Sequence, residues 1–278
     1  MRRPAPAGLR GALAALCLTA ASIAAAPALA APAPAQPRTM AELPDWSGVW
    51  QRIGTNVFDP ATATPGGAGN PGVRAFPPYN ATWEAKYLAN IEKVKADTFP
   101  DPLTYCGIPA GFPRLMSLPD TYQFVLRPEQ VWILTENGPN TMRIYTDGRP
   151  HPPAEDVWHT YTGDSVGHWE GDTLVFDTIA MKGDGDAIID RTGIVLSDQA
   201  HVVTRMRKLP DGVLEAKMVI TDPVAFTRPW NVTRTWRKMP AGTRVYDYAC
   251  AENNRNPVAP SGKTLTLGAD GKVLDKDQ

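Results

Sequence analysis

The chain has few cysteines and little excess of charge of either sign. It contains three cysteines in 278 residues, and its 28 lysines and arginines nearly balance 29 acidic residues. A disulfide-rich scaffold needs a much higher cysteine content, and a nucleic-acid-binding surface normally needs an excess of basic residues. We therefore expect neither a small fold held by many disulfides nor a nucleic-acid partner.

Long apolar runs are missing from the sequence after its first 30 residues. Arg2 and Arg3 precede an Ala/Leu-rich stretch, and Ala28-Leu29-Ala30 follows it. A basic start, an apolar middle and small residues before a cleavage point are the parts of a secretory signal. A transmembrane span fits less well, because the stretch is rich in alanine and is broken by Pro27. We predict a signal peptide at 1–30, a periplasmic or secreted protein, and no membrane span in the mature chain.

Removal of residues 1–30 leaves two cysteines, Cys106 and Cys250, and 25 basic residues against 29 acidic ones. In an oxidising compartment two cysteines most simply form one disulfide, with two buried free thiols as the alternative. Such a bridge would close a loop of roughly 145 residues and contribute about 4–5 kcal/mol in the chain-entropy model. We predict the disulfide Cys106–Cys250 in a mildly acidic mature protein.

The four histidines follow no zinc-binding pattern. They lie at His151, His159, His168 and His201, with no H-x-H or HExxH spacing and no neighbouring pair of cysteines. The glycine-rich residues 66–72 lack the lysine, the preceding strand and the following helix of a phosphate-binding loop. We predict no bound metal and no organic cofactor.

One catalytic motif is present by sequence but stands in the wrong context. Residues 163–167 read Gly-Asp-Ser-Val-Gly and match G-x-S-x-G. The nucleophile elbow requires a helix after the serine, whereas the residues that follow have the composition of a strand. We interpret the match as accidental.

The mature chain of 248 residues is long enough for one sizeable core. We predict a Pro/Ala-rich linker at 31–44, a single domain at 45–256 and a polar tail at 257–278. One helix is expected at about 80–96, where Trp83, Tyr87, Leu88, Ile91 and Val94 fall on one helical face.

Short β-rich runs separated by turn residues fill most of the remaining chain. The predicted strands are Gly48–Ile53, Thr121–Arg127, Gln130–Glu136, Thr141–Thr146, Val166–Trp169, Thr173–Ala180, His201–Lys208, Val213–Thr221, Asn231–Lys238 and Arg244–Cys250. This pattern predicts an all-β fold, an antiparallel barrel of about 8–10 strands with one covering helix. Gly48-x-Trp50 at the first strand is similar to the opening signature of lipocalin-like barrels.

His168 and Glu170 are the first candidates for catalysis. They lie two residues apart on a predicted strand and therefore share a face, while Trp169 points to the other side. On an inward face, the carboxylate would orient the imidazole and support its protonated form, as in an acid–base pair. In the alternative, Glu170-Gly171-Asp172 is only a turn whose acids bind turn amides.

A second group of residues has the chemistry to bind a small molecule. Arg143 and Tyr145 share a face of their strand, and Arg149 follows the Asp147-Gly148 turn. A guanidinium and a phenol on one wall suit a carboxylate or phenolate ligand; the alternative is a surface ladder with a weak ion pair. The other candidate ligand-binding residues are His151, Trp169, His201, Arg205 and Trp230.

Four longer motifs resemble a family of secreted proteobacterial proteins. They are RIYTDGRPHP, GHWEGDTLVFDT, TDPVAFTRPW and CAENN, and the resemblance extends from DWSGVW to CAENN. It implies a lipocalin-like β-barrel and brings no activity with it. The residue before Ser165 is often histidine in that family, whereas here it is Asp164.

Two functions fit these observations. In the first, a periplasmic enzyme without an organic cofactor binds a small apolar or aromatic molecule, and His168 and Glu170 transfer a proton in a lyase, isomerase or hydrolase reaction. In the second, the same pocket belongs to a ligand-binding or carrier barrel without turnover. His168 and Glu170 on the exterior of the barrel would contradict the first hypothesis in this form.

Overall fold

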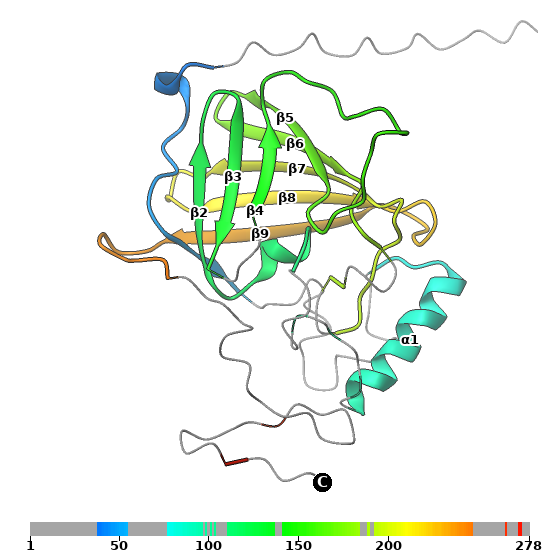
Figure 1. Ribbon diagram of the computed structural model, residues 1–278. Helices are drawn as coiled ribbons and strands as arrows, with labels where there is room; N and C mark the ends of the chain where they lie inside the picture. Colours follow the sequence, from blue (N-terminus) through cyan, green and yellow to red (C-terminus); the bar gives the residue numbers. More distant parts are fainter. Residues whose placement is uncertain are drawn as a thin grey trace, which may run out of the picture. The chain divides into compact units, whose positions relative to one another are not determined.

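Within the residues that the structure describes, nine strands close into a barrel (Figure 1). The computed structural model describes residues 38–54, 77–96, 98, 101, 103, 110–136, 141–183, 188–189, 192–246, 265 and 272–273, which belong to one compact unit. The strands are β1 (Trp50–Ile53), β2 (Thr121–Leu126), β3 (Gln130–Thr135), β4 (Thr141–Tyr145), β5 (Asp164–Glu170), β6 (Thr173–Ile179), β7 (His201–Lys208), β8 (Leu214–Thr221) and β9 (Trp230–Lys238). The predicted all-β barrel with one covering helix is confirmed.

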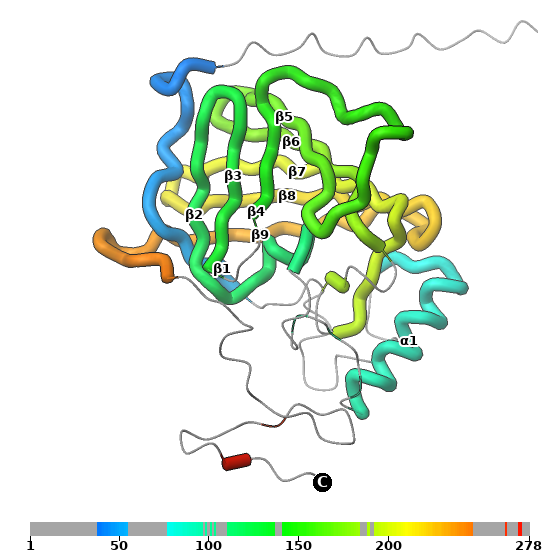
Figure 2. The backbone as a smooth tube through the Cα atoms, in the orientation of Figure 1, coloured from blue at the N-terminus to red at the C-terminus, as the bar shows by residue number. Residues whose placement is uncertain are grey.

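The barrel is mixed rather than wholly antiparallel. β4 and β5 run parallel and pair at Tyr145↔Val166, while the other neighbouring strands are antiparallel. The structure therefore differs from the predicted antiparallel barrel at this one pair of strands. A parallel neighbour requires the chain to travel back along the barrel, and the 18 residues 146–163 make this crossover (Figure 2).

One predicted strand is not found in its described part, and several other predicted features lie outside the described residues. Residues 244–246, the described part of the predicted strand Arg244–Cys250, are not in a strand. Cys106, Cys250 and residues 1–37 lie outside the described residues. The disulfide, the signal peptide and the domain boundaries thus remain predictions.

The barrel interior is apolar because strand residues alternate between the two faces of the sheet. On β7, Val202, Thr204 and Met206 are buried, whereas their neighbours His201 and Arg205 are more exposed. Large aromatic side chains from several strands meet in this interior. Burial of each such side chain contributes about 1.5–3 kcal/mol.

An aromatic cluster fills the interior beside β1 and β2. Phe124 lies at its centre, with ring centroids 6.3 Å from Trp46, 6.4 Å from Trp50 and 5.7 Å from Trp236, all in edge-on geometry. Edge-on pairs place the positive ring edge against the negative ring face, which adds to the stabilisation from burial. The cluster therefore connects Trp46, near the start of the described chain, with the first strand (Trp50) and the last strand (Trp236) of the barrel.

Helix α1 (Ala81–Lys95) lies beside the barrel and extends the core (Figure 1). Asn80 caps it, since its side-chain oxygen accepts the Trp83 N–H at 3.1 Å. Trp83, Tyr87 and Ile91 are buried on its inner face. In the described part of the chain, no helix has both the length and the apolar character needed to span a membrane.

Gly163 permits the tight entry into β5 that places Asp164. Its φ is +70°, and a Cβ there would lie 2.4 Å from the Ile179 carbonyl oxygen. Gly163→Ala is therefore expected to lower the free energy of unfolding by about 2–4 kcal/mol, from the left-handed conformation and the clash together. Chemical denaturation measures this loss.

Gly171→Ala is the matched control, because Gly171 has φ +56° but no neighbouring atom within 4 Å of the added Cβ. It should cost only about 1–2 kcal/mol, from backbone conformation alone. Equal losses for the two variants would show that the contact with Ile179 does not limit this turn.

Candidate functional site

β5 divides its residues between the barrel interior and the outer face of the sheet. Ser165 is 1% exposed, and its hydroxyl lies 2.9 Å from that of the buried Thr178 inside the barrel. Because alternate residues face opposite sides, His168 and Glu170 lie on the outer face. Their interpretation as an acid–base pair that lines the barrel interior is therefore wrong.

His168 and Glu170 instead form a surface ion-pair cluster with Arg205. His168 Nε2 lies 3.2 Å from Glu170 Oε1, and Arg205 Nη2 donates to Glu170 Oε2 at 2.6 Å. Val175 pairs with both His168 and Arg205 across the sheet and is 8% exposed beneath them. Arg205 and then His168 lower the pKa of the exposed Glu170 carboxyl. Exposed pairs of this kind contribute little to stability because solvent screens them, so the cluster mainly shields Val175.

A second group of outer-face residues is more tightly connected, and we call it the outer-face network. It consists of Asp164, Asp177, His151 and His201. His151 Nδ1 lies 2.5 Å from Asp164 Oδ1, and His151 Nε2 lies 3.4 Å from Asp177 Oδ2. His201 Nε2 donates a hydrogen bond to Asp177 Oδ1. Each oxygen of the Asp177 carboxylate thus faces a different imidazole.

Strand pairing explains how the two acids and His201 come together. Val166 pairs with Asp177, so Asp164 and Asp177 are diagonal neighbours on adjacent strands. Asp177 also pairs with Val203, which places His201 diagonally across from it on β7. The sheet alone therefore gathers three of the four residues.

The fourth residue, His151, comes from the crossover between β4 and β5. It follows Pro150 and precedes Pro152, so its backbone is restricted on both sides. Its ring lies between the two carboxylates and is less exposed than that of His201. The network therefore attaches the crossover to the outer face of the sheet.

The charges of the network favour the protonated form of both imidazoles. Burial lowers the pKa of His151, but its interactions with Asp177 and Asp164 outweigh this effect and raise the pKa above 6.5. The hydrogen bond to Asp177 raises the pKa of His201 against the opposing effect of burial. Burial alone would raise the pKa of Asp177, but its interactions with His151 and His201 lower it well below 3.8.

One ring nitrogen of the network remains available. Among the described residues, His201 Nδ1 has no hydrogen-bond partner, and the His201 side chain is 40% exposed. An imidazole with one nitrogen fixed by a carboxylate and the other open to solvent can donate or accept a proton. The network therefore has the chemistry of an oriented acid–base group.

Arg149 and Tyr145 lie near the network, but Arg149 is already engaged. Its guanidinium lies 4.0 Å above the Tyr145 ring, and its Nη2 donates to Asp147 Oδ2 at 2.6 Å. Its Nε donates to both oxygens of Asp147 at 3.0 Å. Arg143 shares the outer face of β4 and is exposed. Of these two arginines, Arg143 has the more accessible charge for a ligand.

The two tryptophans among the predicted ligand-binding residues lie in or against the core. Trp230 is 2% exposed and packs edge-on against Phe226 at 6.0 Å. Trp169 faces inward from β5, opposite to the prediction that placed His168 and Glu170 on the inner face, and its ring is 5.5 Å from that of Trp46. Neither side chain lies on the outer face with the network.

No feature of the sequence points directly to Asp177, which connects the two imidazoles. Asp164 stands out in the sequence as a departure from the family motif, but its role is not visible there. Both acids fit an ordinary strand pattern, and their partners are distant in sequence. A signal becomes visible only when β5, β6 and β7 are placed side by side in the correct register.

The described residues contain no group of three or more histidine, cysteine or acidic side chains arranged to hold a metal ion. Comparison of the chain with protein-family models and with curated proteins gives no match. The family resemblance of the sequence motifs therefore remains a proposal, and the site is interpreted from its geometry.

The outer-face network makes stability depend on pH in a defined direction. Histidines with raised pKa values stabilise the fold fully below about pH 6.5, and this contribution is lost as pH rises through their folded pKa values. We therefore expect the thermal midpoint to fall as the pH rises above about 6.5, and His151→Ala to flatten this fall. Thermal unfolding followed by circular dichroism measures both curves.

Asp177 acts at the opposite end of the pH range. Its lowered pKa stabilises the fold above about pH 3.8, and the contribution is lost as pH falls through the folded value. Arg205→Ala is the control, because it breaks only the separate ion pair with Glu170. The same pH dependence in His151→Ala and wild type would contradict the role of the network.

Proposed function

We propose that the protein is a cofactor-independent acid–base enzyme that acts on a small, mainly apolar or aromatic molecule at the outer-face network. The observation that carries this proposal is the position of Asp177 between His151 and His201. A base oriented by a carboxylate is the arrangement that recurs where enzymes transfer protons. The signal-like residues 1–30 support a periplasmic or secreted location for this activity.

In this proposal His201 is the catalytic residue and the other members of the network position it. Asp177 fixes the Nε2–H of His201, which leaves Nδ1 to exchange a proton with the substrate. His151 faces the second oxygen of Asp177 and is itself bonded to Asp164. This connection restrains the carboxylate, and through it the imidazole ring.

The surroundings of His201 support an apolar substrate. Val203 lies two residues from His201 on the same face of β7 and pairs with Val219 on β8. Val219 is 37% exposed, so these two side chains offer an apolar surface beside the imidazole. Lyase, isomerase and hydrolase reactions all use such a proton-transferring group.

Solvent deuterium incorporation tests the proposal without knowledge of the full reaction. The full chain is incubated in D₂O with a panel of aryl ketones and arylacetate esters, and exchange of their acidic C–H protons is followed by NMR. Wild type should accelerate exchange for at least one member of the panel. His201→Ala should then lose about 10²–10⁴-fold of this acceleration, the usual contribution of an acid–base group.

His168→Ala is the matched control, because His168 also contacts a carboxylate on the outer face but lies outside the network. It should keep the wild-type rate. Loss of exchange in His168→Ala with retention in His201→Ala would place the chemistry at His168 and Glu170. If a panel molecule binds without any exchange, the alternative of a non-catalytic ligand-binding barrel is correct.

The pH profile of the exchange reaction tests the positioning role of Asp177. Proton abstraction requires neutral His201, so the rate should rise with pH through an apparent pKa above 6.5. Asp177→Asn removes the carboxylate that favours imidazolium and should move this midpoint to lower pH. An unchanged midpoint in the variant would contradict the role assigned to Asp177.

A further inference from the structure

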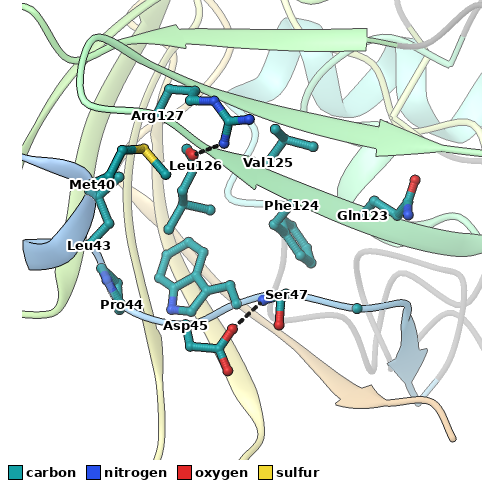
Figure 3. A pocket seen from close by; sticks show the side chains of 12 residues that line it. Met40, Leu43, Pro44, Asp45, Ser47, Gln123, Phe124, Val125, Leu126 and Arg127 are labelled. Carbon is teal, nitrogen blue, oxygen red and sulfur yellow. Dashed lines mark hydrogen bonds between the residues drawn. The ribbon is translucent and has the colours of Figure 1, made fainter. Parts of the chain in front are cut away.

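The barrel wall is open along part of strand β2. β1 pairs with β2 only at Trp50↔Tyr122 and Gln51↔Thr121, although β2 continues to Leu126. Beyond this point residues 43–48 run beside β2, and the described chain has no backbone hydrogen bond between the two. A hollow of about 410 Å³ separates them, which we call the β2 groove (Figure 3).

The hydrogen-bonding pattern of β2 determines which backbone groups face this groove. Arg127 and Gln130 exchange two backbone hydrogen bonds, of 2.9 and 3.3 Å, at the turn into β3. Bonded and non-bonded pairs alternate along an antiparallel ladder, so Val125 also bonds to β3. Phe124 and Leu126 then direct their N–H and C=O groups away from β3, towards the β2 groove.

The hydrogen bonds at the other end of the β2–β3 ladder follow the same alternation. There the Glu136 N–H donates to the Thr121 carbonyl at 3.3 Å, and Tyr122 is the residue that pairs with β1. The assignment of Phe124 and Leu126 to the open side therefore agrees from both ends of β2.

Three backbone groups remain without a partner among the described residues. The Leu126 carbonyl accepts a hydrogen bond from Arg127 Nη1 at 3.0 Å, as Figure 3 shows. The N–H and C=O of Phe124 and the N–H of Leu126 have no such contact. The backbone groups of an unpaired strand edge cost free energy when they are covered without a hydrogen-bond partner. An occupant that supplies these bonds would remove the cost.

We infer that the β2 groove binds a short, extended, uncharged peptide segment, which adds to β2 as an extra strand. A donor, an acceptor and a second donor at strand spacing are the complement of an extended backbone, which is recognised in this way at open sheet edges. Met40, Leu43 and Pro44 on the opposite wall are apolar and suit neutral side chains (Figure 3). The acid on that wall, Asp45, already accepts the Ser47 N–H at 2.9 Å.

The length of the open edge limits the segment to about four residues, at roughly 3.3 Å per residue. Arg127 lies at one end of the β2 groove and Gln123 towards the other (Figure 3). The β2 groove lies on a different part of the barrel from β5, β6 and β7, which carry the outer-face network. This inference therefore stands or fails independently of the proposed enzyme activity.

Amide hydrogen exchange, measured by NMR on the full chain, tests the inference directly. The probe is the blocked tetrapeptide acetyl-Thr-Val-Thr-Val-amide. Exchange at the Phe124 and Leu126 amides should be fast in the free protein and should slow at least about tenfold at saturating peptide. The Val125 amide, bonded within the β2–β3 ladder, serves as the internal reference and should be protected throughout.

Two further probes decide between a strand and other occupants. The same tetrapeptide, N-methylated at its second and third residues, loses backbone donors and should bind at least about tenfold more weakly. Equal binding of the two peptides would overturn the inference. So would Phe124 and Leu126 amides that are already protected in the free protein. Acetyl-valine-amide that binds as tightly as the tetrapeptide would overturn it in favour of a small-molecule site.

Discussion

The parallel pairing of β4 and β5 is the constraint on which the candidate site depends. Antiparallel neighbours can be joined by a tight turn, but a parallel neighbour obliges the chain to cross back over the barrel before it re-enters the sheet. Residues 146–163 make that crossover and carry His151 onto the outer face. Without this crossover, His151 would not reach the outer face, and His201 would be the one histidine of the network left beside Asp164 and Asp177.

The alternation of strand residues separates two environments in this protein. Inside the barrel, aromatic and aliphatic side chains from all nine described strands pack against one another, so the interior is occupied by core. On the outer face, charged residues gather over β5, β6 and β7. His151 is the most shielded of these charged groups, and its interactions gain from this because electrostatic interactions strengthen as water is excluded. The side chains of His168, Glu170 and Arg205 are at least 40% exposed, against 18% for His151, and their interactions contribute correspondingly less.

The sequence predicted the elements of the fold well and the site only in part. The helix was expected at about 80–96 and lies at Ala81–Lys95, because its apolar residues follow a clear helical period. All nine described strands lie within about two residues of their predicted bounds at each end, since turn residues mark their limits. The largest differences are at two strand starts: β1 begins at Trp50 rather than Gly48, and β5 begins at Asp164 rather than Val166.

What the sequence did not provide was the pairing of strands and the direction of their faces. A shift of one residue in register moves every side chain to the opposite face, so His168 and Glu170 were expected inside the barrel and lie outside. His151 and His201 were candidates, but nothing in their local sequence indicated a shared carboxylate. Asp177 enters the site only through its cross-strand neighbours Val166 and Val203.

The most direct test of this account is an NMR titration of the histidine rings in wild type and in Asp177→Asn. The account predicts that the pKa values of His151 and His201 both lie above 6.5 in wild type and both fall in the variant, because one carboxylate faces both rings. If the two histidines titrate alike in the two proteins, Asp177 does not connect them. The outer-face network would then be a set of separate surface contacts rather than a site.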